Sequence, residues 1–98
     1  MSAYFIVRAD VRDWEGFQAY VDRSPGVLAR FGGRHIARGG RTVTFEGPEE
    51  TRRIVIAQFP DFESAEACYR SAEYQAIIPL REGNAVFEFI LTDGLDGV

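Results

Sequence analysis

The chain contains no lysine, because all eleven of its cationic side chains are arginines. Schiff-base chemistry, amine nucleophiles and a Walker-type phosphate lysine are therefore excluded. Cysteine and histidine each occur once, as Cys68 and His35. One chain can therefore form neither an internal disulfide nor a metal cage of two or three histidines. We expect no metal site and no other cofactor.

Positive charge and long apolar runs are also scarce. Eleven arginines stand against fifteen acidic residues, a net charge of -4, so the basic field that attracts nucleic acid is missing. No stretch approaches the ~20 apolar residues of a membrane helix, and the N-terminal run has neither a basic leader nor a cleavage site. We expect one domain over residues 1–98, located in the cytoplasm, with no nucleic-acid or membrane partner.

Hydrophobic periodicity predicts strands at residues 3–10, 34–38, 42–46, 53–59 and 85–92. A first helix begins after Asp13 and ends before Gly32, and Pro25 is expected to kink it or divide it in two. Asp61 and Ser71 are expected to cap two further helices. Residues 34–38 and 42–46 would form a hairpin or a broken edge strand around two glycines. This order predicts an α+β fold, a split βαβ sandwich whose antiparallel sheet carries helices on one face.

Alternation along the strands divides the sheet into two faces. One face is entirely apolar and would pack against the helices: Phe5, Val7, Ala9, Val55, Ala57, Phe59, Phe87, Phe89 and Leu91. The other face is two-thirds apolar: Tyr4, Ile6, Arg8, Ile54, Ile56, Gln58, Val86, Glu88 and Ile90. The helices can cover only one side, and soluble monomers rarely expose so large an apolar patch. We therefore expect a homodimer, packed sheet against sheet, that encloses a cavity.

Four ordered motifs, at residues 31–40, 58–60, 71–75 and 79–81, resemble a bacterial family, domain of unknown function 1330, from Tyr4 to Gly94. The resemblance implies a ferredoxin-like fold within the dimeric α+β barrel superfamily. That superfamily includes cofactor-free monooxygenases, isomerases, haem-binding members and barrels of no known activity, so it does not fix a reaction. Gln58 stands where relatives usually carry Glu, which removes a possible base. Cys68 stands where they carry Trp, and is expected to be a small buried hydrophobe.

Two pairs of charged residues are candidate ligand contacts. Arg8 and Glu88 are expected on neighbouring strands, where they form an ion pair at the cavity rim or act on a ligand. In the second case Arg8 holds an anionic group and Glu88 is a general base whose pKa is raised by apolar surroundings. Arg34 and Arg38 are expected on one strand face, pointing towards the cavity opening. They would recognise a carboxylate or form a solvated basic edge.

The remaining candidates also have structural alternatives. Ser71 is a helix cap or a catalytic hydroxyl, and Tyr74 packs or donates a hydrogen bond. Arg81 is an expected anion contact together with Arg8 and Arg38. His35, on the strand face opposite Arg34, is a core or interface histidine, a general base or a haem ligand.

The expected site thus combines two groups that move protons, Glu88 and His35, with seven binding residues: Arg8, Arg34, Arg38, Gln58, Ser71, Tyr74 and Arg81. The leading hypothesis is a cytoplasmic homodimer whose inter-sheet cavity binds a small, partly apolar, anionic metabolite. Its chemistry would be cofactor-free acid–base or oxygenase-type catalysis. The alternative is a non-catalytic dimerisation or ligand-sensing module whose polar inner residues satisfy one another.

Overall fold

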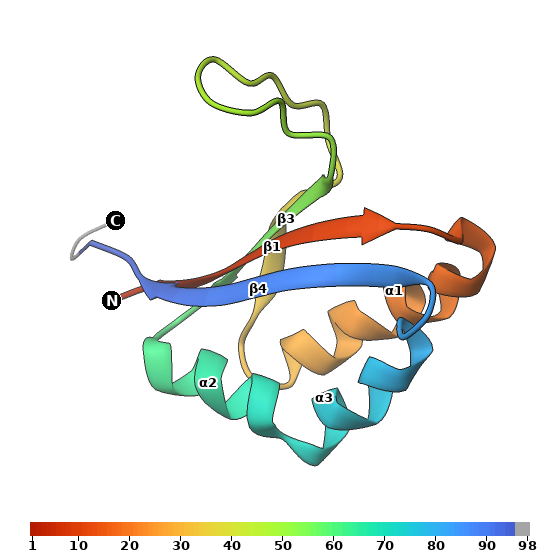
Figure 1. Cartoon of the computed structure of the whole chain (residues 1–98). Helices are drawn as coiled ribbons and strands as arrows, with labels where there is room; N and C mark the ends of the chain where they lie inside the picture. Colours follow the sequence, from red (N-terminus) through yellow and green to blue (C-terminus); the bar gives the residue numbers. More distant parts are fainter. Residues whose placement is uncertain (96–98) are drawn as a thin grey trace.

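The computed structural model describes residues 1–95. Its elements are β1 (Ala3–Val11), α1 (Trp14–Ala29), β2 (Arg34–Arg38), β3 (Arg53–Phe59), α2 (Phe62–Arg70), α3 (Ala72–Ile77), a short 3-10 helix η1 (Ile78–Leu80) and β4 (Ala85–Asp93). The antiparallel sheet has the order β2-β3-β1-β4, and the helices lie against one of its faces (Figure 1). This is the split βαβ sandwich predicted from the sequence. Within residues 1–95, no helix has the length and apolar character needed to cross a membrane.

The three predicted helix caps are confirmed. In each of Asp13, Asp61 and Ser71, a side-chain oxygen accepts a hydrogen bond from the backbone N–H three residues further along the chain. Each bond satisfies an N–H that has no partner inside the helix. The bond from Ser64 also holds the pKa of Asp61 below its ordinary value. The caps therefore fix where the helices begin, and with them the residues that each helix turns towards the sheet.

The two faces of the sheet are also confirmed. The apolar set predicted to face the helices is buried in the core or packed against it, together with Phe17, Tyr20, Leu28, Tyr74 and Ile77. On the opposite side, no helix of the described chain covers Tyr4, Ile6, Arg8, Ile54, Ile56, Gln58, Val86, Glu88 and Ile90 (Figure 1). We call this second set the open face. Val86 and Ile90 are its most exposed apolar members, at 57% and 55%.

One predicted strand is wrong. Residues 42–46 form no strand and belong to a loop, residues 39–52, that joins β2 to β3. The composition of this stretch suits a strand, but β3 already pairs with β2 on one side and with β1 on the other. The sheet keeps two free edges, at β2 and at β4, and residues 42–46 pair with neither. The chain turns away at Gly39, whose φ of 70° lies in the left-handed region that glycine adopts without strain.

Of the two outcomes predicted for Pro25, a kink or a division of the first helix, the division is wrong, because α1 runs through Pro25 as one helix from Trp14 to Ala29. Proline has no N–H to donate to the carbonyl four residues earlier, which here belongs to Val21. The guanidinium of Arg38 supplies the missing bond, with Nη2 donating to Val21 O at 2.8 Å. A side chain from β2 thus binds the carbonyl that the proline leaves without a partner inside the helix.

Candidate functional site

A cavity of about 40 Å³ lies between α1 and the covered face of the sheet. We call it the helix-side pocket. Its walls are mostly apolar, and its polar lining residues are Tyr20, Ser24, His35, Arg38, Arg53 and Tyr74. A water molecule needs roughly 10–15 Å³ of such space, so the pocket has room for about three waters or for one small apolar group.

A β-bulge in β2 decides which side chains reach this pocket. The register of β2 against β3 shifts between His35 and Ala37. Before the shift, Arg34 lies on the open face and donates from Nη2 to Gln58 Oε1 at 3.0 Å. After it, Arg38 lies opposite Val55 on the helix side. The prediction that both arginines share a face is therefore wrong, since one extra residue reverses the alternation. The prediction that His35 lies opposite Arg34 is confirmed.

The hydrogen bond to Val21 fixes Arg38 at the pocket. Its guanidinium bridges from β2 to α1, although the residue as a whole is exposed. Pro25 leaves the Val21 carbonyl without its usual partner inside the helix, because any other residue at position 25 would offer its own N–H to it. Pro25 therefore acts as a positioning residue for the pocket's exposed arginine.

His35 lies in a positively charged part of the pocket. Burial lowers its pKa below the ordinary value, and the nearby guanidinium groups of Arg38 and Arg53 lower it further. Burial and Arg38 likewise lower the pKa of Arg53. Within residues 1–95, no carboxylate forms an ion pair with either arginine. The imidazole is therefore neutral at pH 7, and the region favours an anion.

Tyr20 and Tyr74 form the inner wall of the pocket. Their hydroxyl oxygens are 2.5 Å apart, and burial raises the pKa of both phenols, so both are neutral at pH 7. The guanidinium of Arg81 lies beside them, 4.1 Å from the ring centroid of Phe87 and 5.5 Å from that of Tyr20. Its buried Nε has no hydrogen-bond partner among residues 1–95. Two predicted site residues, Tyr74 and Arg81, are thus brought together, with Tyr74 lining the pocket and Arg81 behind it.

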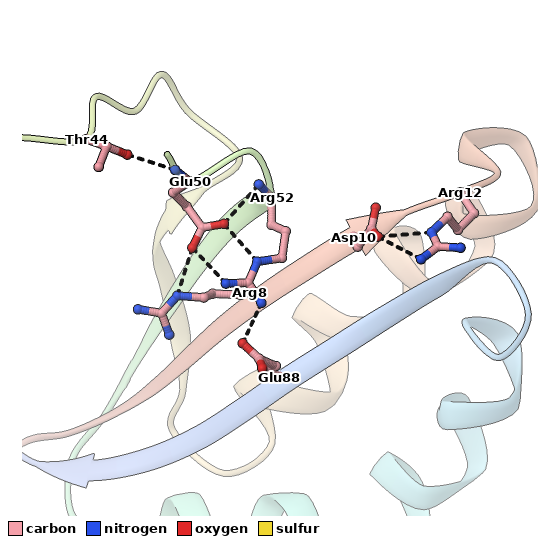
Figure 2. Close-up of polar contacts among 7 residues, drawn as sticks. All are labelled: Arg8, Asp10, Arg12, Thr44, Glu50, Arg52 and Glu88. Carbon is pink, nitrogen blue, oxygen red and sulfur yellow. Dashed lines mark hydrogen bonds and ion pairs between the residues drawn. The ribbon is translucent and has the colours of Figure 1, made fainter. Parts of the chain in front are cut away.

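Arg8 and Glu88 are cross-strand neighbours, as predicted, but they do not bind each other. Arg8 Nε donates to Glu50 Oε1 at 3.1 Å, and Arg52 Nη1 donates to Glu88 Oε1 at 2.5 Å. Arg52 also binds Glu50, through Nε to Oε2 at 2.8 Å, and closes a network of four charges on the open face (Figure 2). Hydrogen bonds from Arg52, with a smaller contribution from Arg8, lower the pKa of Glu50 to about 2. Each charge has an opposite partner, so this network is a structural one in the single chain.

The last two predicted contacts, Gln58 and Ser71, also have partners within the chain. Gln58 accepts from Arg34 and donates from Nε2 to Ser2 Oγ at 3.1 Å. Ser71 donates to the Cys68 carbonyl at 2.6 Å while it caps α3. Cys68 is buried, as predicted for a small hydrophobe, and burial raises the pKa of its thiol to about 12.

Eight of the nine predicted site residues therefore divide between two places, and the ninth, Ser71, lies apart from both. His35, Arg38 and Tyr74 line the helix-side pocket and Arg81 lies next to it. Arg8, Arg34, Gln58 and Glu88 lie on the open-face side of the sheet, and Ser71 lies at the start of α3. Sequence reasoning did not select Tyr20, Ser24 or Arg53 for the site. Tyr20 had a usable signal, since it shares the helical spacing of Phe17 and Leu28 on the buried side of α1.

A comparison with known protein families identifies the family of this chain. The model of a domain of unknown function, DUF1330, matches residues 2–95. The chain belongs to the DUF1330 family. Comparison with curated proteins finds no match.

Solved structures place this DUF1330 chain among ferredoxin-like proteins. A Rhodopseudomonas palustris protein of unknown function, RPA0582, superposes with a TM-score of 0.76 at 21% identity, over 97% of this chain and 83% of its own. SnoaB, a cofactor-independent oxygenase from Streptomyces nogalater, gives 0.69 at 17% identity, over 99% and 96%. A dimeric protein of unknown function with a ferredoxin-like fold from Bacteroides fragilis gives 0.56 at 11% identity, over 95% and 96%. At these identities the likeness establishes the fold, and the predicted ferredoxin-like class is confirmed.

Proposed function

We propose that the chain binds a small, partly apolar carboxylate in the helix-side pocket. The observation that carries this proposal is an apolar cavity bordered by the guanidinium groups of Arg38 and Arg53, neither of which has a carboxylate partner within residues 1–95. The apolar end of the ligand would enter the cavity of about 40 Å³. Its carboxylate would accept charge-assisted hydrogen bonds from the two arginines on the solvent side. Because so little space is enclosed, the apolar part is limited to a short chain.

The binding test uses the only histidine and the only tryptophan of the chain as probes. A bound anion would favour the protonated imidazole, so butyrate should raise the pKa of His35 measured by NMR titration, whereas neutral butyramide should not. Trp14 should report the same event by fluorescence, since the Arg53 guanidinium lies 5.1 Å from its ring centroid. Arg38→Ala should weaken butyrate binding by about tenfold, which corresponds to ~1.4 kcal/mol.

The matched control is Arg23→Ala, an exposed arginine of α1 that does not line the pocket. It removes the same charge from the chain and should leave the titration unchanged. Equal butyrate affinity in Arg38→Ala and the parent, with unchanged melting temperatures, would contradict the proposed site.

We propose, further, that His35 acts as a base on the bound molecule, which amounts to cofactor-free acid–base chemistry. A neutral ring nitrogen would take a proton from carbon next to a carbonyl group. The C–H electron pair would move to the carbonyl oxygen as an enolate, whose charge the neighbouring guanidinium groups would stabilise. Proton abstraction of this kind is a first step shared by isomerisation and by oxygenation without a cofactor.

One measurement distinguishes the two classes of function predicted from the sequence, catalysis and ligand binding without catalysis. If His35 acts as a base, 2-oxobutyrate in D₂O should exchange its C3 protons faster in the presence of the chain, and His35→Gln should abolish the acceleration. The exchange can be followed as loss of the C3 proton signal by NMR. Butyrate binding without any such acceleration would contradict the catalytic step and leave the alternative, a non-catalytic ligand-binding module.

We also propose that two copies pack together through their open faces. The apolar members of that face, with Val86 and Ile90 more than half exposed, support this assembly because burying them removes apolar surface from water. The network of Arg8, Glu50, Arg52 and Glu88 carries no net charge, so covering it would leave no charge without a partner. The Bacteroides relative described as dimeric has the same fold. The enclosed chamber would be the inter-sheet cavity predicted from the sequence.

A further inference from the structure

The loop of residues 39–52 leaves the sheet on the side opposite the helices. Figure 1 shows it as the yellow-green segment that rises from the ends of β2 and β3, away from α1, α2 and α3. The hydrogen bonds agree with this placement, because Glu50 of the loop binds Arg8 of the open face. We call this loop the arm. It projects on the side where the open face lies uncovered.

The neck of the arm is held firmly. Glu50 accepts hydrogen bonds from Arg8 and from both the backbone and the side chain of Arg52 (Figure 2). The backbone N–H of Glu50 in turn donates to Thr44 Oγ1 at 2.9 Å, which ties the two sides of the arm together. These contacts fix the direction in which the arm leaves the sheet. Glu50 is therefore an anchor between the arm and the open face.

Two apolar side chains of the arm lie outside the hydrophobic core of the described residues. Val43 is 70% exposed and Phe45 is 89% exposed, and neither belongs to the hydrophobic core or to the residues packed against it. A single exposed apolar residue is ordinary in soluble proteins. Here two of them flank Thr44 in a segment whose base is fixed by ion pairs, on the same side as an uncovered apolar sheet face. Burying a phenylalanine removes a large apolar surface from water, so a partner surface there would gain a sizeable contact.

The length of the arm indicates what it contacts. Packed sheets lie about 10 Å apart. About half of the arm runs outwards and half returns, and seven residues span at most roughly 23–25 Å when fully extended. A second sheet packed on the open face would therefore lie well within reach of the tip, which would pass beside it.

We propose that the arm clasps a second copy of this chain, with Val43 and Phe45 packed against that copy. This inference rests on the proposed dimer and adds to it a contact that the sheet faces alone do not make. In a two-fold dimer each chain would give one arm and receive one, so every arm residue counts twice in the interface.

The test is Phe45→Asp, measured by sedimentation velocity over a range of protein concentrations. Phe45 is 89% exposed and lies outside the core of the described residues, so circular dichroism should be unchanged, whereas the dimer dissociation constant should rise at least tenfold. Thr42→Asp is the matched control, because it adds the same charge to an exposed position of the same arm. It should leave the dissociation constant within about twofold.

The possible outcomes separate this inference from the dimer itself. A parent chain that dimerises, with Phe45→Asp dimerising equally well, would overturn the role of the arm and leave the proposed dimer in place. A parent chain that stays monomeric at all concentrations would overturn both. A dimer weakened by Phe45→Asp but not by Thr42→Asp supports the clasp.

Discussion

Replacing Gly33 with alanine is expected to destabilise the chain by about 3 kcal/mol, the upper end of the usual cost of overpacking a core. A Cβ added at Gly33 would lie under 3.0 Å from three carbons of the Phe59 ring. That ring is 1% exposed and packs against Phe5 at a centroid distance of 4.6 Å, so it has nowhere to move. Gly33 directly precedes β2, and the same displacement would shift His35 and Arg38. Urea unfolding followed by circular dichroism measures the change.

Gly26→Ala provides the control for this substitution. Gly26 lies inside α1, and a Cβ built there meets no atom within 4 Å. Alanine is favoured over glycine in a helix interior by up to ~1 kcal/mol, so this variant should be as stable as the parent or more stable. If both variants unfold at the parent's urea concentration, the close approach of Gly33 to Phe59 does not limit stability.

The sheet and its two faces could be predicted because their signals are local and repeated. Phe87, Phe89 and Leu91 alternate with Val86, Glu88 and Ile90 along one strand, and β1 and β3 repeat the pattern. A two-residue period assigns each side chain to a face without knowledge of the rest of the chain. The helix starts were predictable for the same reason, since a capping side chain binds a backbone group only three residues away.

The helix-side pocket could not be predicted because it depends on contacts between distant segments. The bulge after His35 adds one residue to β2 without any composition that marks it, yet it moves Arg38 from the open face to the pocket. From the sequence alone, Pro25 predicts a kink or a break in the first helix. The compensating bond comes from Arg38, on another element. Both predictions failed because they depend on contacts between segments that are far apart in the sequence.

The ion network on the open face illustrates the same limit. Arg8 and Glu88 were predicted as neighbours from the strand order expected for this fold, and their Cα atoms do face each other. Glu50, 42 residues away from Arg8, nevertheless binds that arginine, because the arm returns over the sheet. Strand pairing predicts which backbones meet. It does not predict which side chain of a loop forms an ion pair with a charged residue on a strand.

Ile90→Asp is expected to weaken the proposed dimer at least 100-fold, which corresponds to ~2.8 kcal/mol of association free energy. Ile90 lies on β4 opposite Ile6 and is 55% exposed. In one chain the new carboxylate would face water from an edge strand, so the fold should tolerate it. Between two apolar sheet faces the same carboxylate would lose its hydration without gaining a partner, and that desolvation opposes association strongly.

Sedimentation velocity measures this change, and Ala72→Asp is the control that separates it from a general effect of charge. Ala72 is the first residue of α3, on the helix side of the sheet, where a carboxylate interacts favourably with the helix N-terminus. That variant should dimerise like the parent, whereas Ile90→Asp should sediment as a folded monomer at concentrations where the parent is dimeric. An Ile90→Asp chain as dimeric as the parent would mean that the open face is not the surface through which copies meet. The proposals for the arm and the inter-sheet chamber, which both assume packing through the open faces, would then be contradicted. The proposal for the helix-side pocket would be unaffected, because one chain forms that pocket alone.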